Sequence, residues 1–159
     1  MTVSPVVAPV AVGLRPATPA DAAACAAWYA STRGDLAALG PAAAPLIASQ
    51  HTAREAHYAA TRPGAEDAIM TLDGAPVGRL LLDRTGDPEV IVDIVVAAAL
   101  RGRGIGTAVL REVLAGAFAA GRGVALATAP GSGTGTWYAR LGFVPTGEAG
   151  GYTRWEARP

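Results

Sequence analysis

The sequence predicts an α+β fold in which helices flank a mixed, mostly antiparallel sheet, an α/β three-layer arrangement. Apolar runs of strand length alternate with helical stretches, and Asp73-Gly74 is a tight-turn signal between two apolar runs. An apolar strand at residues 89–97 also leads almost directly into a glycine-rich turn and a helix. We find no repeat or linker in the 159 residues and expect one domain over residues 1–159, with a loose N-terminus at 1–9.

The first half of the chain contains two helices and three strands. A short strand at residues 10–15 precedes a helix that begins at Thr18 and Pro19, because threonine caps helix N-termini well and proline fits the first turn. A second helix is expected at 45–60. The two strands on either side of Asp73-Gly74 form a hairpin.

The second half begins with the strand at 89–97. The segments that follow it are a helix at 104–120, a strand at 123–129, a short helix at 134–142 and a strand pair at 142–148 and 151–157. We expect the helix at 104–120 to bury Ile105, Val109, Val113 and Phe118 on one side.

Composition excludes several classes of function. Thirteen acidic residues balance thirteen basic ones, so no basic excess points to nucleic acid or to an anionic membrane. Every basic residue is arginine, which excludes lysine Schiff-base chemistry and a Walker-type phosphate lysine. Cys25 is the only cysteine, so no intrachain disulfide forms, and we expect no metal site.

Residues 1–13 contain two prolines and lack the basic start of a signal peptide. No apolar run is long and clean enough to span a bilayer. We therefore expect a cytoplasmic protein with no membrane partner.

The stretch VVAAALRGRGIGTAVLREVL, from Val95 to Leu114, is the most informative part of the chain. A helix N-terminus preceded by glycines presents unpaired N–H groups and the positive end of the helix dipole, and so binds anions. The loop that could hold a phosphate or diphosphate comprises Arg101, Gly102, Arg103, Gly104, Ile105, Gly106 and Thr107.

Its spacing excludes two common nucleotide motifs. A P-loop needs Gly-Lys-Ser/Thr, and the chain has no lysine. A dinucleotide fingerprint that starts at Gly104 would need its third glycine where Val109 stands.

The spacing of Arg101, Gly104 and Gly106 resembles the diphosphate-binding signature Arg/Gln-x-x-Gly-x-Gly/Ala of the GNAT acyltransferase superfamily. Downstream, WYARLGF (Trp137–Phe143) is similar to the second signature of that superfamily. The ordered patterns HY, PGA, DG-PVGRL, VDI and LRGRGIGTAVL also resemble a bacterial clade within it. The resemblance covers residues 14–156 and implies a sheet that splays between its fourth and fifth strands, acetyl-CoA as cosubstrate, and a monomer or homodimer.

The resemblance also implies roles for particular residues. The backbone of Ile94, Val95 and Val96 would hold the pantetheine arm and the thioester carbonyl. Tyr138 matches the tyrosine that donates a proton to the departing sulfur, although it could instead only pack against the sheet. Ser132 stands where the clade has an asparagine that touches the pantetheine, which predicts weaker acyl-CoA binding.

Asp93 interrupts the apolar run VIVDIVV, where a charge is costly unless it is paired. If the loop at 84–88 closes a regular hairpin, Arg79 lies opposite Asp93 and forms a cross-strand ion pair with it. Alternatively, Asp93 is the base, or orders a water that accepts the proton of the amine. The two roles are compatible.

On the second helix, Gln50, Arg54 and His57 share one face, which either contacts the acceptor or is solvated. Arg54 and Arg79 would favour an acceptor that carries an anion. The leading hypothesis is therefore an N-acetyltransferase that acts on a small-molecule amine or a protein amino group. The alternatives are a catalytically degenerate GNAT domain that binds acyl-CoA as a sensor or interaction module, and an unrelated nucleotide-binding fold.

Overall fold

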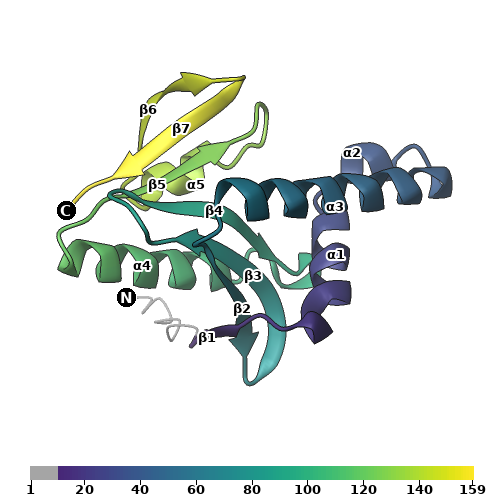
Figure 1. The fold of residues 1–159 in the computed structure, drawn as a ribbon, viewed down its shortest axis with the longest axis horizontal. Coiled ribbons are helices and arrows are strands. Elements are labelled where there is room, and N and C mark those ends of the chain that lie inside the picture. Colours follow the sequence, from purple (N-terminus) through teal and green to yellow (C-terminus); the bar gives the residue numbers. More distant parts are fainter. Residues whose placement is uncertain (1–10) are drawn as a thin grey trace, which may run out of the picture.

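The computed structural model describes residues 11–159, which form a seven-stranded sheet in the order β1-β2-β3-β4-β5-β7-β6 (Figure 1). The strands are β1 (Gly13–Pro16), β2 (Glu66–Leu72), β3 (Ala75–Asp83), β4 (Glu89–Val96), β5 (Val124–Thr128), β6 (Val144–Ala149) and β7 (Tyr152–Ala157). The helices are α1 (Ala22–Ala30), α2 (Gly34–Ala37), α3 (Ala44–Thr61), α4 (Ile105–Ala119) and α5 (Gly135–Arg140). Only β4 and β5 pair in parallel, so the predicted mixed, mostly antiparallel sheet is confirmed.

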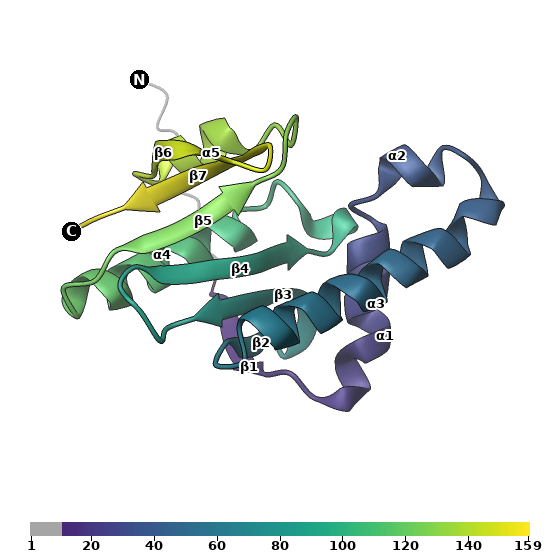
Figure 2. The ribbon, with the colours of Figure 1, turned by 45° about the horizontal axis from the view of Figure 1, so that its top comes forward.

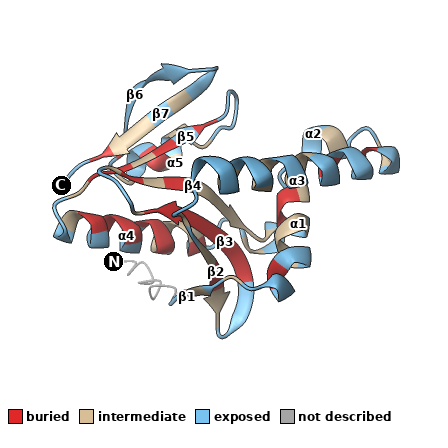
Figure 3. Cartoon of the chain, in the orientation of Figure 1, coloured by how far each residue is buried: buried red, intermediate tan, exposed pale blue. Residues whose placement is uncertain are grey.

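Helices cover both faces of the sheet: α1 and α3 lie on one side and α4 on the other (Figure 2). The main core fills the space between α4 and the sheet, and α3 is mostly exposed (Figure 3). Ile105, Val109 and Val113 are buried there as predicted, whereas Phe118 is only partly buried. The face that carries α1 and α3 contains charged side chains that are buried or half-buried, among them Arg79 and Asp93.

Local sequence signals account for the ends of several elements. The first helix region begins with a 3₁₀ turn, Pro19–Asp21, and the Asp21 carboxylate accepts hydrogen bonds from the N–H (2.8 Å) and hydroxyl (2.9 Å) of Thr18. Asp73 and Gly74 both adopt positive φ, 51° and 80°, as a two-residue hairpin turn requires. The first strand starts later than expected, and Val10 and the expected loose segment 1–9 lie outside the described residues.

The fourth and fifth strands diverge, as the family resemblance implied. They pair only at Glu89–Val124 and Val90–Ala125, after which the two strands separate. Glu89 is fully buried at this closed end, between the guanidinium groups of Arg84 (3.0 Å) and Arg122 (2.7 Å). The paired cations offset the cost of burying the carboxylate and hold together the point where the fork begins.

The predicted Arg79–Asp93 ion pair is wrong. The strand pairs next to the loop are already one residue out of the expected register, and an irregularity between Leu81 and Leu82 adds a second residue. Arg79 therefore lies opposite Val95, and Asp93 opposite Leu81. Both charged side chains still need partners because they are largely buried, and each finds them on other elements, as described below.

Candidate active site

The three glycines around the start of α4, two in the preceding loop and one in the first turn of the helix, serve two different purposes. Gly102 and Gly104 adopt left-handed φ values of 75° and 83°, with open space where a side chain would begin. Gly106 instead lies under Trp137, because a Cβ there would stand 3.2 Å from the indole ring. The indole N–H donates to the Thr107 hydroxyl (2.9 Å), which fixes α5 against the first turn of α4.

The loop leaves its backbone donors available. Within residues 11–159, the N–H groups of residues 102–107 have no protein acceptor, and Gly104 provides no side-chain cap for α4. Six consecutive residues with free N–H groups at the positive end of a helix suit a diphosphate. Arg103 is exposed beside them, whereas Arg101 donates to the Val96 carbonyl (3.0 Å) and to the Ser31 hydroxyl (2.7 Å).

Beyond the fork, β4 presents an edge that β5 does not cover. Ile94, Val95 and Val96 lie in this part of the strand, past the last β4–β5 pair. An extended arm that carries amide groups can hydrogen-bond to such an edge in β fashion. The Val96 carbonyl accepts a hydrogen bond from the Arg101 side chain, which connects the open strand edge directly to the glycine loop.

A cleft of about 1520 Å³ follows the fork, between α3 on one side and β5 and β7 on the other. Tyr138 of α5 lines it and is 7% exposed, surrounded by the rings of Trp137, Phe143 and Trp155. Burial, together with the negative charge of Asp93, raises the pKa of Tyr138 to about 12. The phenol therefore keeps its proton at any working pH and can donate it.

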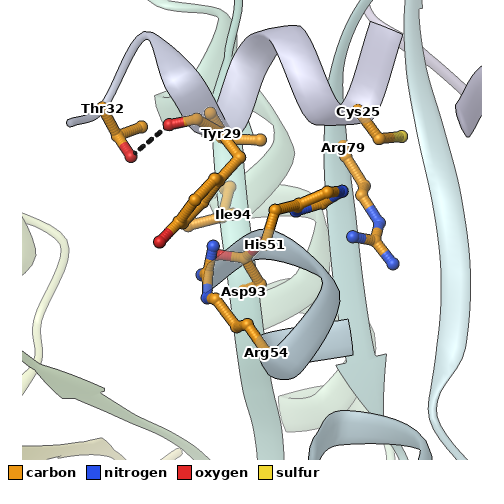
Figure 4. A pocket seen from close by; sticks show the side chains of 9 residues that line it. Cys25, Tyr29, Thr32, His51, Arg54, Arg79, Asp93 and Ile94 are labelled. Atoms are coloured by element: carbon orange, nitrogen blue, oxygen red, sulfur yellow. Dashed lines mark hydrogen bonds and ion pairs between the residues drawn. The ribbon is translucent and has the colours of Figure 1, made fainter. Parts of the chain in front are cut away.

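Asp93 projects from β4 toward α3, where Arg54 donates a hydrogen bond of 2.5 Å to it (Figure 4). The Arg54 guanidinium lies 5.0 Å from the Tyr29 ring centroid and 5.2 Å from that of Tyr58, and it donates to the Tyr58 hydroxyl (2.7 Å). Two aromatic rings and two polar contacts therefore fix one cation, which in turn fixes the Asp93 carboxylate at the edge of the cleft.

Arg79 is committed to other side chains. It makes four hydrogen bonds of 2.7–2.8 Å, two to Glu55 of α3 and two to Asp67 of β2. It lines a smaller pocket of about 210 Å³ that opens between α1, α3 and β4. With most of its donors used, Arg79 ties α3 to the sheet and has little capacity left for a substrate anion.

His57 and Gln50, the other two residues predicted to contact the acceptor, differ in whether they line the cleft. His57 is exposed and lines the large cleft together with Arg54. Gln50 lies outside the cleft lining and accepts a hydrogen bond from Arg33 of the α1–α2 connection. Only part of the predicted helix face therefore reaches the cleft.

Ser132 lines the cleft in the loop between β5 and α5. Its hydroxyl lies 3.0 Å from that of Thr134, and the two glycines beside it adopt φ values of 69° and 70°. The serine is therefore present at the predicted place, with its short side chain partly engaged within its own loop.

Sequence reasoning missed the aromatic residues and the histidine that surround Arg54. Tyr58 stands four residues after Arg54, a spacing that predicts contact on a helix and could have identified it. Tyr29 lies in an alanine-rich helix with no such signal. His51 stacks on Tyr29 with ring centroids 5.2 Å apart, a contact that depends on how α1 and α3 pack.

The thiol of Cys25 and the arrangement of possible metal ligands also bear on the chemistry. Burial raises the pKa of the Cys25 thiol, which opposes thiolate formation in the smaller pocket. In the part of the chain that the structure describes, no cluster of His, Cys, Asp and Glu could hold a metal, and no helix is long and apolar enough to cross a membrane.

A sheet forked between β4 and β5, with a glycine loop at the start of the next helix, is the arrangement expected of the acyl-CoA-dependent acyltransferases that the sequence resembles. The chain belongs to the GNAT acetyltransferase family, since the family model for the acetyltransferase (GNAT) domain matches residues 64–145. That match spans the hairpin, the fork, the glycine loop and Tyr138.

Solved structures agree with this assignment. A GCN5-related N-acetyltransferase from Rhodopseudomonas palustris is 26% identical, with a TM-score of 0.67 over 92% of this chain and 95% of that one. The PaiA N-acetyltransferase of Thermoplasma acidophilum, solved with coenzyme A, is 12% identical, with a TM-score of 0.69 over 94% and 99%. A GNAT family acetyltransferase from Elizabethkingia anophelis, solved with acetyl-CoA, is 16% identical, with a TM-score of 0.56 over 93% and 98%. No curated protein sequence matches the chain.

Proposed function

We propose that the protein is an acetyl-CoA-dependent N-acetyltransferase, which moves the acetyl group to a primary amine of a small molecule or protein by direct attack. The observation that carries this proposal is the run of unpartnered amides at residues 102–107, next to the uncovered edge of β4. Structures of family members bound to coenzyme A or acetyl-CoA support the same cosubstrate.

The residues present fit acetyl-CoA. The free amides of residues 102–107 would bind the diphosphate, and the exposed Arg103 would add positive charge. The backbone of Ile94, Val95 and Val96 would hold the pantetheine arm, with Ser132 as a further contact. When bound, acetyl-CoA supplies an activated thioester whose acyl carbon accepts an amine.

The side chains of the cleft would provide the proton chemistry. Tyr138 would donate its proton to the departing sulfur, and its phenol is protonated for this step because its pKa is raised to about 12. Asp93, held by Arg54, would bind the ammonium form of the acceptor or order the water that carries its proton away. Arg54 and His57 would contact the rest of the acceptor, and Gln50 and Arg79 would support them from α3 and β3.

A pair of isosteric variants tests the cosubstrate. Asp and Asn are similar in size and both tolerate left-handed backbone, so Gly104→Asp and Gly104→Asn differ mainly in charge at the anion site. Calorimetric titration with acetyl-CoA should show binding by the native protein, weaker binding by Gly104→Asn and the weakest binding by Gly104→Asp. Equal affinities of the two variants, or no binding by the folded native protein, would contradict the proposal.

A second candidate function is a domain that binds acyl-CoA without turnover. The loop between β5 and α5 favours this function. Ser132 lies there between two glycines, and its hydroxyl is hydrogen-bonded to that of Thr134 instead of reaching freely into the cleft. A screen of primary amines by release of the coenzyme A thiol separates the two functions. Binding of acetyl-CoA without release for any amine would favour the second.

A further inference from the structure

The pocket of about 210 Å³ contains a histidine that the mechanism above does not use. His51 of α3 lines it together with Asp93, Ile94 and Val95 of β4, so it faces the segment proposed to hold the thioester. The Tyr29 ring, stacked at 5.2 Å with an interplanar angle of 27°, fixes the orientation of the imidazole (Figure 4).

The two ring nitrogens of His51 differ in their surroundings. Nδ1 is buried with no hydrogen-bond partner among the described residues, and the nearest acid is Glu55 one helical turn later, with Nδ1 and Oε1 3.9 Å apart. A carboxylate beside Nδ1 favours the tautomer that carries its proton there, which leaves the Nε2 electron pair free. Nε2 is not among the buried unpartnered atoms, so this electron pair remains accessible.

Glu55 is held in the ionised form that this arrangement needs. Burial alone would raise the pKa of Glu55, but the hydrogen bonds and charge of Arg79, with a smaller contribution from His51, lower it. A fixed carboxylate at this distance would also stabilise an imidazolium after Nε2 has taken a proton.

The charged groups around the pocket favour a cation. The titratable and charged groups of the lining are Arg54 from α3, Arg79 from β3, Asp93 from β4, and Cys25 and Tyr29 from α1. Behind this lining, Glu55 of α3 and Asp67 of β2 pair with Arg79, and Asp93 pairs with Arg54. Among these groups three carboxylates stand against two guanidinium groups, which are both engaged with them. Because both guanidinium groups of the lining are already paired, the lining offers little to an acceptor anion, and the Asp93 carboxylate in the pocket wall suits an alkylammonium group.

We propose that His51 is the proton acceptor of the reaction: the ammonium group of the acceptor enters the smaller pocket, contacts Asp93 and gives its proton to His51 Nε2. The inference rests on the proposed acetyltransferase function and deepens it by assigning a cationic primary amine as acceptor. The N–H bond of the ammonium breaks, and its electron pair forms the new C–N bond to the acyl carbon as the C–S bond breaks. The sulfur takes a proton from Tyr138. The surplus proton that the new C–N bond leaves on nitrogen passes through water to the Tyr138 phenolate, and His51 releases its own proton to water.

The pH dependence of the rate distinguishes this role from a structural one. A primary alkylamine has a pKa near that of lysine, about 10.4, so the free amine grows about tenfold per pH unit below that value. With the best amine from the thiol-release screen, His51→Gln should lower kcat/KM by about 100-fold at pH 7. The deficit should shrink steadily toward pH 9.5, where free amine no longer needs the base. Thr52→Gln, on the exposed side of the same helix, is the control and should match the native profile.

A deficit that stays constant over this pH range, or no deficit, would overturn the role of His51 while leaving the acetyltransferase proposal intact.

A second measurement does not depend on turnover. The chain has two histidines, so ¹⁵N-histidine spectra contain two imidazoles, which His57→Gln assigns. Addition of n-butylammonium, with and without coenzyme A, should shift the His51 resonances. A shift confined to His57, or none in either condition, would overturn the assignment of the pocket.

Discussion

The two sides of the fork are built in different ways. On the side that we propose binds the cofactor, called the cofactor side below, the free amides of residues 102–107 and the edge of β4 offer backbone groups. The side chains there matter mainly at the positions that require glycine. On the proposed acceptor side, side chains from α1, α3 and β4 form a network that contains Arg54, Asp93, His51 and Tyr29. A backbone site depends on local conformation, whereas a side-chain site depends on how distant segments pack. Substitutions on the two sides should therefore affect different substrates.

The largest expected effect concerns Tyr138, which lies where the two sides meet. Tyr138→Phe should lower kcat by about 100-fold, because it removes the proton donor and leaves the ring packing in place. Acetyl-CoA affinity, measured by calorimetry, should remain unchanged. Since the pKa of Tyr138 is raised to about 12, the pH–rate profile of the native protein should show no fall from deprotonation of this phenol below about pH 10. A kcat close to native would remove Tyr138 from the chemistry.

The next effect tests the cofactor side through its packing. Gly106→Leu places a side chain against Trp137, 3.2 Å from the position of the new Cβ, and should destabilise the fold by about 1–3 kcal/mol. Because the first turn of α4 must shift, acetyl-CoA binding should weaken by roughly tenfold. Gly116→Leu is the control, on the exposed side of the same helix where a Cβ meets nothing. Similar results for the two variants, in thermal melts and calorimetry, would argue against the close packing.

A smaller effect is expected for the acceptor side. Arg54→Met removes the cation that fixes Asp93, and the KM for the amine should rise by roughly tenfold, as for a lost charged hydrogen bond. The Kd of acetyl-CoA should not change, and neither constant should change in Arg111→Met, an exposed site on α4. An equal rise in the KM of the amine and the Kd of acetyl-CoA for Arg54→Met would contradict the separation of the two sides.

The smallest effect concerns how α1 is attached to the sheet. Hydrogen bonds from Arg15, and then from Thr18, lower the pKa of Asp21 well below its usual value. A carboxylate with a lowered folded-state pKa contributes stability above its unfolded pKa of about 3.9 and loses that contribution as the pH falls below it. The difference in Tm between the native protein and Asp21→Asn should therefore be constant from pH 7 to about 5 and shrink toward pH 2. A difference that grows on acidification would contradict this.

The same contrast explains what could be predicted from the sequence. The hairpin at Asp73-Gly74, the helix ends and the glycine loop are set by neighbours in the chain, and all were predicted within a few residues. The partner of Asp93 was not predicted, because two offsets of one residue add up: one at the loop that joins β3 and β4, and one at the irregularity between Leu81 and Leu82. Neither offset carries a clear sequence signal. Arg54 lies 39 residues from Asp93, and only the packing of α3 brings the two together.

Arg101 links the proposed cofactor site to the proposed acceptor pocket. It connects the strand edge at Val96 to Ser31 at the end of α1, 70 residues away in the chain. A diphosphate that draws the guanidinium away from Ser31 releases the helix end that carries Tyr29 and Thr32, both of which line the acceptor pocket. Since thermodynamic coupling between two ligands is reciprocal, an acceptor that favours one position of this helix end must alter the affinity for the cofactor by the same factor. A single arginine thus gives the two substrates a direct route to cooperativity.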